Sequence, residues 1–176
     1  MMMLEKDKKW YVGRTRARQE KKIKLRLNDL GVENYIPLRR ETRIYAGGRR
    51  RQVDVPLLPN LMFIRVVPDE RFALLSQLGG LWMQYVVDRF TGSSMVVPDK
   101  QVEDFIRLVE SRDATLSVED LHLRKGDRVC VKDGAFAGLE GECLELRGKT
   151  RVVVRIEGLT VLSVEVPAKY LEKTGK

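Results

Sequence analysis

The spacing of apolar residues in this 176-residue chain changes near residue 120, and this change limits the possible folds most. Before it, apolar residues with helical spacing alternate with short β-branched runs. After it, helical spacing is absent, and four short β-branched segments with glycine-bearing turns fill under sixty residues. Such crowding favours a small, strongly bent barrel over a sandwich. The sequence therefore predicts a mixed α+β domain followed by a small all-β barrel.

The polar stretch between these two patterns is interpreted as a linker because it has no sustained periodicity. We expect the first domain at residues 8–112, the linker at 113–120 and the barrel at 121–174. The strands of the barrel are expected at residues 128–131, 142–146, 151–156 and 162–167.

The first domain is expected to hold three helices. Thr15 is a candidate N-cap for the first helix, which places Ile23, Leu27 and Leu30 on one face and ends at Gly31. The second helix follows Asp69, and the third follows Asp99 with the clearest amphipathic spacing in the chain. The apolar positions of the third helix are Val102, Phe105, Ile106 and Val109.

The same domain is expected to contain an antiparallel sheet and a hairpin. Gly47-Gly48 marks the hairpin turn, since glycine takes positive φ without strain. Residues 61–67 form a continuous apolar run that is typical of a buried strand. The remaining extended segments are expected at residues 10–13, 35–38, 42–45, 52–55, 85–87 and 95–97.

The positive charge of the chain is concentrated near its start. The chain carries 33 Lys and Arg against 25 Asp and Glu, a net charge of +8, and residues 1–59 alone hold 16 basic and 7 acidic residues. Such a local excess favours a polyanionic partner, and nucleic acid is the first candidate. Solubility alone explains the excess equally well.

Two groups of basic residues are candidates for nucleic-acid binding. The first surrounds the start of the first helix, where free N–H groups and arginines together favour phosphate. The second, at the hairpin tip, is placed to reach DNA or a protein surface. The first group is Arg14, Arg16, Arg18, Lys21 and Lys22, and the second is Arg49, Arg50 and Arg51. A solvated basic surface is the alternative for both groups.

The reactive residues of the chain exclude several classes of protein. His122, Cys130 and Cys143 are three ligands where a structural zinc site needs four, so we expect no metal. Two cysteines also exclude a disulfide-rich scaffold, and we expect both as free, buried thiols. No signal peptide, membrane span, catalytic constellation or nucleotide-binding fingerprint is visible. We therefore expect a cytoplasmic, non-enzymatic monomer without a cofactor and without membrane contact.

The start of the barrel carries the most specific motif. Gly126-Asp127 and Asp133-Gly134 form turns, and Gly138 and Gly141 flank Leu139 where the chain must bend. This arrangement closely resembles the KOW motif on its SH3-like barrel.

The first domain resembles the NusG N-terminal domain. The resemblance rests on Trp10-Tyr11-Val12, the Pro-bounded segment 55–64 and Pro98 at the start of the third helix. Together the two parts resemble the NusG family over residues 9–173. Residues 98–107 and 151–159 are more similar to its specialised capsule-operon branch, which is UpxY-like and akin to RfaH.

The resemblance implies a transcription elongation and antitermination factor for a polysaccharide operon, with DNA of the transcription bubble, upstream DNA or nascent RNA as further contacts. A housekeeping NusG-type factor and a ribosome-associated KOW protein that binds RNA are the alternatives. By position, the family's contacts with the clamp helices of RNA polymerase correspond to Leu58, Leu61, Phe63 and Val97. An aromatic residue is usual in the family where Leu58 and Leu61 stand, and ordinary core is the other interpretation of this strand.

The resemblance also implies that the barrel binds ribosomal protein S10 or Rho. The corresponding positions are Phe136, Leu139 and Ile156. We expect Phe136 in the core and Leu139 as the exposed anchor. In RfaH-type proteins this region refolds into helices, but the β-branched run Val152-Val153-Val154 favours a barrel here.

Overall fold

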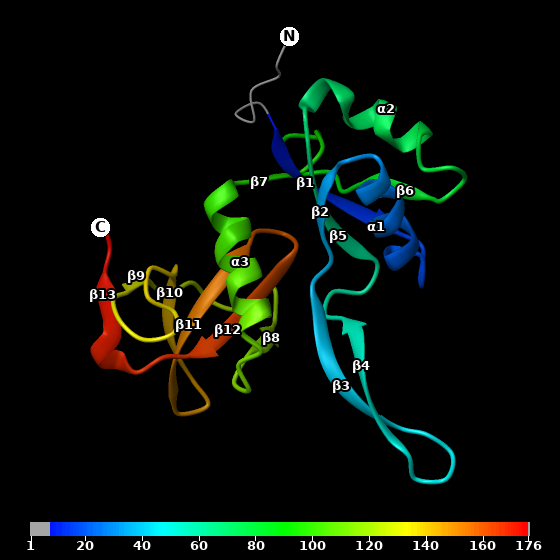
Figure 1. The fold of residues 1–176 in the computed structure, drawn as a ribbon. Helices are drawn as coiled ribbons and strands as arrows, with labels where there is room; N and C mark the ends of the chain where they lie inside the picture. The colour runs from blue at the N-terminus through cyan, green and yellow to red at the C-terminus, as the bar shows by residue number, and fades with distance from the viewer. Residues whose placement is uncertain (1–7, 176) are drawn as a thin grey trace. The chain divides into compact units, whose positions relative to one another are not determined.

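The computed structural model describes residues 8–175, which form two compact units, one ending at Asp99 and one beginning at Lys100. The first unit combines helices with antiparallel strands, and the second contains one long helix and a β-sheet (Figure 1). This is the α+β domain followed by a β-rich barrel that the sequence predicts.

The first unit is built on an antiparallel sheet in which the strand order is β2-β5-β1-β6, and β7 also pairs with β1. The strands are β1 (Lys9–Thr15), β2 (Glu33–Tyr35), β5 (Leu61–Val66), β6 (Met83–Tyr85) and β7 (Val96–Val97). The buried strand expected at 61–67 is therefore confirmed as β5, which pairs with β1 along six residues.

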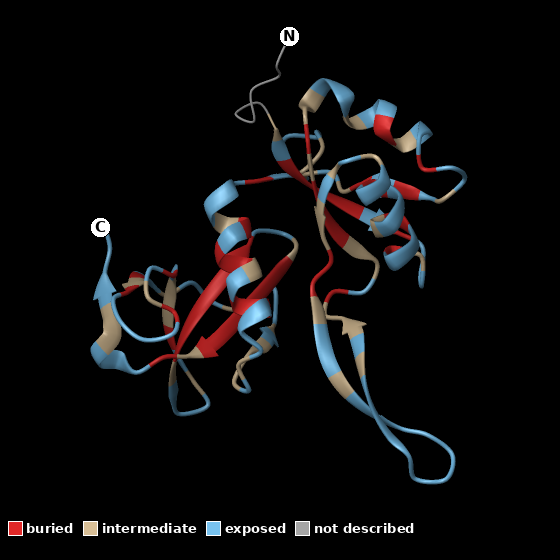
Figure 2. Ribbon diagram, viewed as in Figure 1, coloured by how far each residue is buried: buried red, intermediate tan, exposed pale blue. Residues whose placement is uncertain are grey.

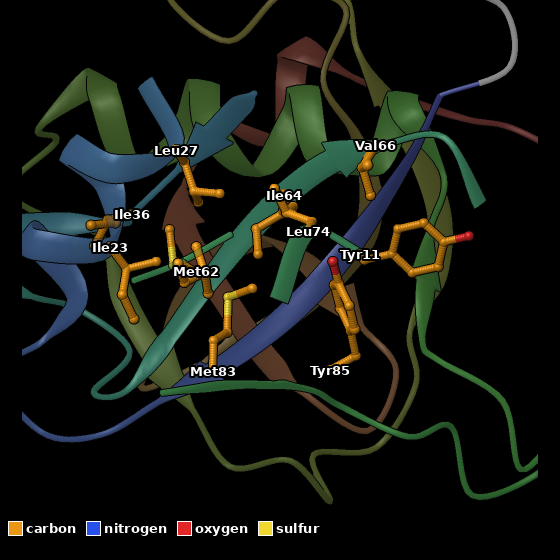
Figure 3. Packing of buried hydrophobic residues seen from close by; sticks show 11 residues of the cluster. Tyr11, Ile23, Leu27, Ile36, Met62, Ile64, Val66, Leu74, Met83 and Tyr85 are labelled. Atoms are coloured by element: carbon orange, nitrogen blue, oxygen red, sulfur yellow. The ribbon is translucent and has the colours of Figure 1, made fainter. Parts of the chain in front are cut away.

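Two helices, α1 (Glu20–Asp29) and α2 (Arg71–Ser76), supply apolar side chains to the core on one face of this sheet. A short 3-10 helix, η2 (Pro68–Glu70), precedes α2, and no side chain caps either of them. Because side chains alternate along a strand, Met62 and Ile64 of β5 point together into this core (Figure 3). Leu27 of α1 and Leu74 of α2 belong to the same cluster.

The end of α1 follows the sequence prediction, but its start does not. Gly31 has a φ of +69° and donates its N–H to Asn28, and Val32 donates to Leu27, which is a Schellman motif. The prediction that Thr15 caps the helix is wrong, because Gln19 is the residue at the N-cap. The N–H of Thr15 bonds the carbonyl of Asn60 at 2.8 Å, so Thr15 ends β1 and the helix begins five residues later.

The hairpin is a separate two-stranded sheet of β3 (Leu38–Ile44) and β4 (Arg50–Pro56). It extends as a long arm, and Figure 2 shows that most of it is exposed. Gly47 and Gly48 both have positive φ in its turn, as the sequence predicts.

The second unit contains α3 (Asp99–Ser111), whose first residue still belongs to the first unit, and a six-stranded sheet in the order β13-β9-β10-β11-β12-β8. These strands are β8 (Ser117–Glu119), β9 (Asp127–Val131), β10 (Glu140–Leu146), β11 (Lys149–Ile156), β12 (Thr160–Glu165) and β13 (Leu171–Lys173). A second 3-10 helix, η3 (Ala168–Tyr170), precedes β13. Part of the expected linker is therefore an edge strand, because β8 pairs with β12.

The helix α3 is bonded to this sheet, so the two compact units divide before it rather than after it. The buried carboxylate of Asp104 accepts from Lys100 at 2.6 Å and from the N–H of Glu140 at 3.3 Å. Arg107 donates to the carbonyls of Ala135 and Ala137 at 2.9 and 2.5 Å. The division at Asp99 lies earlier than the boundary that we expect at 112, and the domain to which α3 belongs stays a prediction.

Two buried arginines connect the strands of the barrel to the segment before it. Arg155 forms a bidentate ion pair with Glu142 at 3.0 and 3.3 Å, and it also donates to the carbonyls of Leu121 and Leu123. Arg151 donates to the hydroxyl of Ser163 at 2.8 Å. Arg151 also donates to the carbonyl of Thr115, and this bond holds the segment that was interpreted as a linker against β11.

Candidate nucleic-acid and polymerase interface

The first basic group surrounds the loop between β1 and α1. Arg14 is the last residue but one of β1, Arg16 and Arg18 lie in the loop that follows, and Lys21 and Lys22 lie in the first turn of α1. All five are exposed. Arg18 has a φ of +65°, in the left-handed region, so the chain cannot be helical there. The arginines therefore precede the helix, contrary to the expectation that they begin it.

The start of α1 is occupied by an acid. Glu20 is buried, and its carboxylate accepts the N–H of Asn60 at 3.1 Å. Gln19, the residue before the helix, accepts the N–H of Trp82 at 3.3 Å. A carboxylate in the first helical turn already satisfies the helix dipole and repels a phosphate. Any phosphate contact here therefore falls to the side chains of the turn and not to the helix end.

An aromatic residue that sequence reasoning missed lies beside this group. The side chain of Trp82 is 38% exposed, and the guanidinium of Arg16 lies 5.7 Å from the centre of its ring. That distance is within the range of a cation–π contact. The signal in the sequence was a tryptophan two residues after the Gly79-Gly80 turn, where a core residue is not required.

The second basic group stands at the end of the hairpin arm. Arg49 lies in the turn, and Arg50 and Arg51 begin β4. All three side chains are exposed.

The candidate polymerase strand faces away from the core that α1 and α2 cover. Leu61 is opposite Arg14 in the sheet, and Phe63 is opposite Val12, so these side chains share the second face. Leu61 is partly exposed, whereas Leu58, Phe63 and Val97 are 7%, 0% and 1% exposed. Leu61 is thus the only one of the four that a partner reaches directly in this conformation, and it stands beside the first basic group.

The candidate partner positions of the barrel are all buried. Phe136 is 7% exposed, which agrees with the expectation of a core position, and Ile156 is 2% exposed. The prediction that Leu139 is an exposed anchor is wrong, because its side chain is completely buried. Its carbonyl accepts the N–H of Val131 at 2.9 Å, so this loop residue follows the strand ladder and its side chain points inward.

Both cysteines are free, as the sequence predicts, although both are partly exposed rather than buried. In the register of β9 and β10, Cys130 is opposite Glu140 and Cys143 is opposite Asp127. Burial raises the pKa of the Cys143 thiol. Within residues 8–175 no group of three or more His, Cys, Asp or Glu side chains is arranged to hold a metal ion, and no helix there is long and apolar enough to cross a membrane.

Comparison with known proteins agrees with this architecture. The family described as "Transcription termination factor nusG" matches residues 8–106, more than half of the chain. Proteins of Streptococcus pyogenes serotypes M1 and M3, each named "Transcription termination/antitermination protein NusG", are 28% identical over 91% of this chain and 94% of their own length. A solved structure titled "Domain interaction in Thermotoga maritima NusG" has a TM-score of 0.50 at 20% identity and covers 98% of this chain and 100% of that chain, a likeness of fold. The chain belongs to the NusG family.

Proposed function

We propose that this chain is a transcription elongation and antitermination factor that binds RNA polymerase and suppresses pausing or termination. The observation that carries the proposal is the NusG family match along residues 8–106. Two relatives that share 28% of their residues with almost the whole chain are named as termination/antitermination proteins, which supports the same assignment.

The contact with the clamp helices is proposed for the second face of the sheet, around Leu61. This side chain is partly exposed and adjoins Arg14, so an apolar anchor and a positive charge stand together. Leu58, Phe63 and Val97 are buried and contribute only if the surrounding side chains move when the polymerase binds.

Binding to reconstituted elongation complexes tests this contact. Leu61→Arg is expected to weaken binding at least tenfold because it places a charge in an apolar contact. Leu25→Arg is the matched control, since Leu25 is 64% exposed on α1 and lies outside the proposed contact. Equal binding by both variants and the wild type contradicts the proposed contact.

The first basic group is proposed to bind DNA of the transcription bubble, upstream DNA or nascent RNA. The five exposed cations around the start of α1 support this proposal. The double variant Arg16→Glu/Lys21→Glu is expected to lower both the affinity for the elongation complex and its dependence on salt, because fewer counterions are released. A salt dependence equal to that of the wild type refutes the contact.

A specialised role in a polysaccharide operon is the finer part of the proposal, and it rests on the resemblance of residues 98–107 and 151–159. Chromatin immunoprecipitation separates it from the housekeeping role. A few occupied operons support the specialised role, and occupancy of most transcribed genes contradicts it. Recruitment of ribosomal protein S10 or Rho by the barrel is proposed on the same resemblance, and a pull-down with each purified partner tests it.

A further inference from the structure

Near the end of the hairpin arm, two positively charged side chains lie directly opposite each other on neighbouring strands. Arg43 of β3 is opposite Arg51 of β4. Two residues further toward the turn, Tyr45 is beside Arg49, and its N–H donates to the carbonyl of Arg49 at 2.9 Å. Alternation along the two strands places these four side chains on one face of the arm. Two arginines directly opposite each other destabilise a hairpin, so folding of the arm does not explain the pair.

The base of the same arm is neutralised, and its end is not. Near the base, Arg39 pairs with Glu41 at 2.5 Å, and Arg40 lies 3.7 Å from Asp54. Within the part of the chain that the structure describes, the four arginines near the end form no ion pair. Three of them, Arg43, Arg49 and Arg51, share one face of the arm with Tyr45, and Arg50 lies on the other face. The uncompensated charge is therefore confined to the end of the arm.

An aromatic ring accompanies this charge. Tyr45 is 47% exposed, and together with Arg49 and Arg51 it lines a depression of about 240 Å³. A guanidinium binds a phosphate through two parallel hydrogen bonds, and an exposed ring stacks on a base of any sequence. In a duplex the bases already stack on one another, so a ring of this kind favours an unpaired strand.

We propose that the end of the hairpin arm binds single-stranded nucleic acid, with Tyr45 stacked on an unpaired base and Arg43, Arg49 and Arg51 on the phosphates around it. The proposal rests on the nucleic-acid part of the proposed function, and it adds the strandedness of the ligand and two residues, Arg43 and Tyr45. The hairpin arm is a different element from those that carry Leu61 and Arg16. A failure of this proposal can therefore be distinguished from a failure of the contacts proposed for Leu61 and Arg16.

Fluorescence anisotropy with the full chain tests the proposal, using labelled oligo-dT of about 20 nucleotides, longer than common single-strand sites, and a duplex of equal length. Tyr45→Leu is expected to raise the Kd for the single strand about tenfold, while the Kd for the duplex and the salt slope stay unchanged. Arg43→Ala/Arg51→Ala is expected to lower the salt slope for the single strand by about 1.4, since each lost phosphate contact removes about 0.7. Arg40→Ala is the matched control and is expected to leave the slope close to that of the wild type, because Asp54 already compensates that charge.

Three results overturn the proposal. The first is an unchanged salt slope in the double arginine variant, and the second is an equal loss of single-strand and duplex affinity in Tyr45→Leu. The third is unchanged oligonucleotide binding by all these variants together with weaker binding to polymerase free of nucleic acid, which assigns the arm to a protein contact. Tryptophan fluorescence of each variant verifies folding, since both tryptophans lie in the first unit.

Discussion

Replacing Glu142 by Gln is expected to loosen the barrel strongly, because Glu142 is half of its bidentate ion pair. The side chains of Arg155 and Glu142 are only 6% and 16% exposed. The change leaves the guanidinium without a countercharge in a buried site, and it weakens the acceptor that Gly126 uses at 3.0 Å. The bonds of Arg155 to backbone carbonyls at residues 121 and 123 remain, so the cost comes from the lost charge.

The size of the effect follows from this burial. Breaking a buried ion pair by removing one partner costs about 3–5 kcal/mol. Because Glu142 keeps some contact with water, we take the lower end, about 3 kcal/mol. Each 1.4 kcal/mol is a factor of ten in an equilibrium constant, so opening of the barrel becomes about a hundredfold more frequent.

Amide hydrogen exchange of the full chain measures this opening directly. Peptides that cover β11 should exchange about a hundredfold faster in Glu142→Gln, while tryptophan fluorescence, which reports on Trp10 and Trp82 in the first unit, stays unchanged. Glu145→Gln, an exposed position on the same strand, is the matched control. Exchange accelerated by less than about threefold in Glu142→Gln would refute the reasoning, since a threefold change is about 0.7 kcal/mol.

Further predictions concern acid, close packing, thiol chemistry and an exposed aromatic. Burial alone raises the pKa of Glu142, but the hydrogen bonds from Arg155 and Gly126 outweigh burial and leave this pKa lowered. The stabilisation by the ion pair is therefore complete above the ordinary carboxyl pKa of about 4.3, and it is lost as the pH falls through the lowered pKa. The difference in urea midpoint between the wild type and Glu142→Gln should vanish in acid. Gly126→Ala should destabilise the barrel by about 2 kcal/mol, read from amide exchange of β10, because the added Cβ would lie 2.2 Å from the carbonyl oxygen of Cys143. The Cys143 thiol, with its raised pKa, should react with iodoacetamide more slowly than free glutathione at the same pH. Phe90→Ser should change the free energy of unfolding by less than about 0.5 kcal/mol, measured by urea unfolding, since Phe90 is 98% exposed.

Elements with strong local signals could be predicted from the sequence. Gly31 ended α1 where expected because the left-handed cap needs a residue without Cβ, and the Gly47-Gly48 pair located the hairpin turn for the same reason. The spacing of Val102, Phe105 and Val109 predicted α3, and these three side chains are buried. In each case the signal lay within a few neighbouring residues.

The sequence predictions that were wrong concern residues whose positions depend on contacts with distant parts of the chain. Thr15 stays in β1 because of a bond to Asn60, and β8 forms because residues 117–119 pair with β12, more than forty residues later. Leu139 is buried by strand pairing that no loop pattern reveals. In the candidate site, the basic residues were found from charge alone, but the contact between Arg16 and Trp82 required the fold that brings them together.

The pause lifetime of a reconstituted elongation complex tests the central proposal most directly. The account predicts that the full chain shortens the lifetime of the paused complex and that Leu61→Arg loses this effect, whereas Leu25→Arg keeps it. A pause lifetime that the wild-type chain leaves unchanged or lengthens would contradict the account.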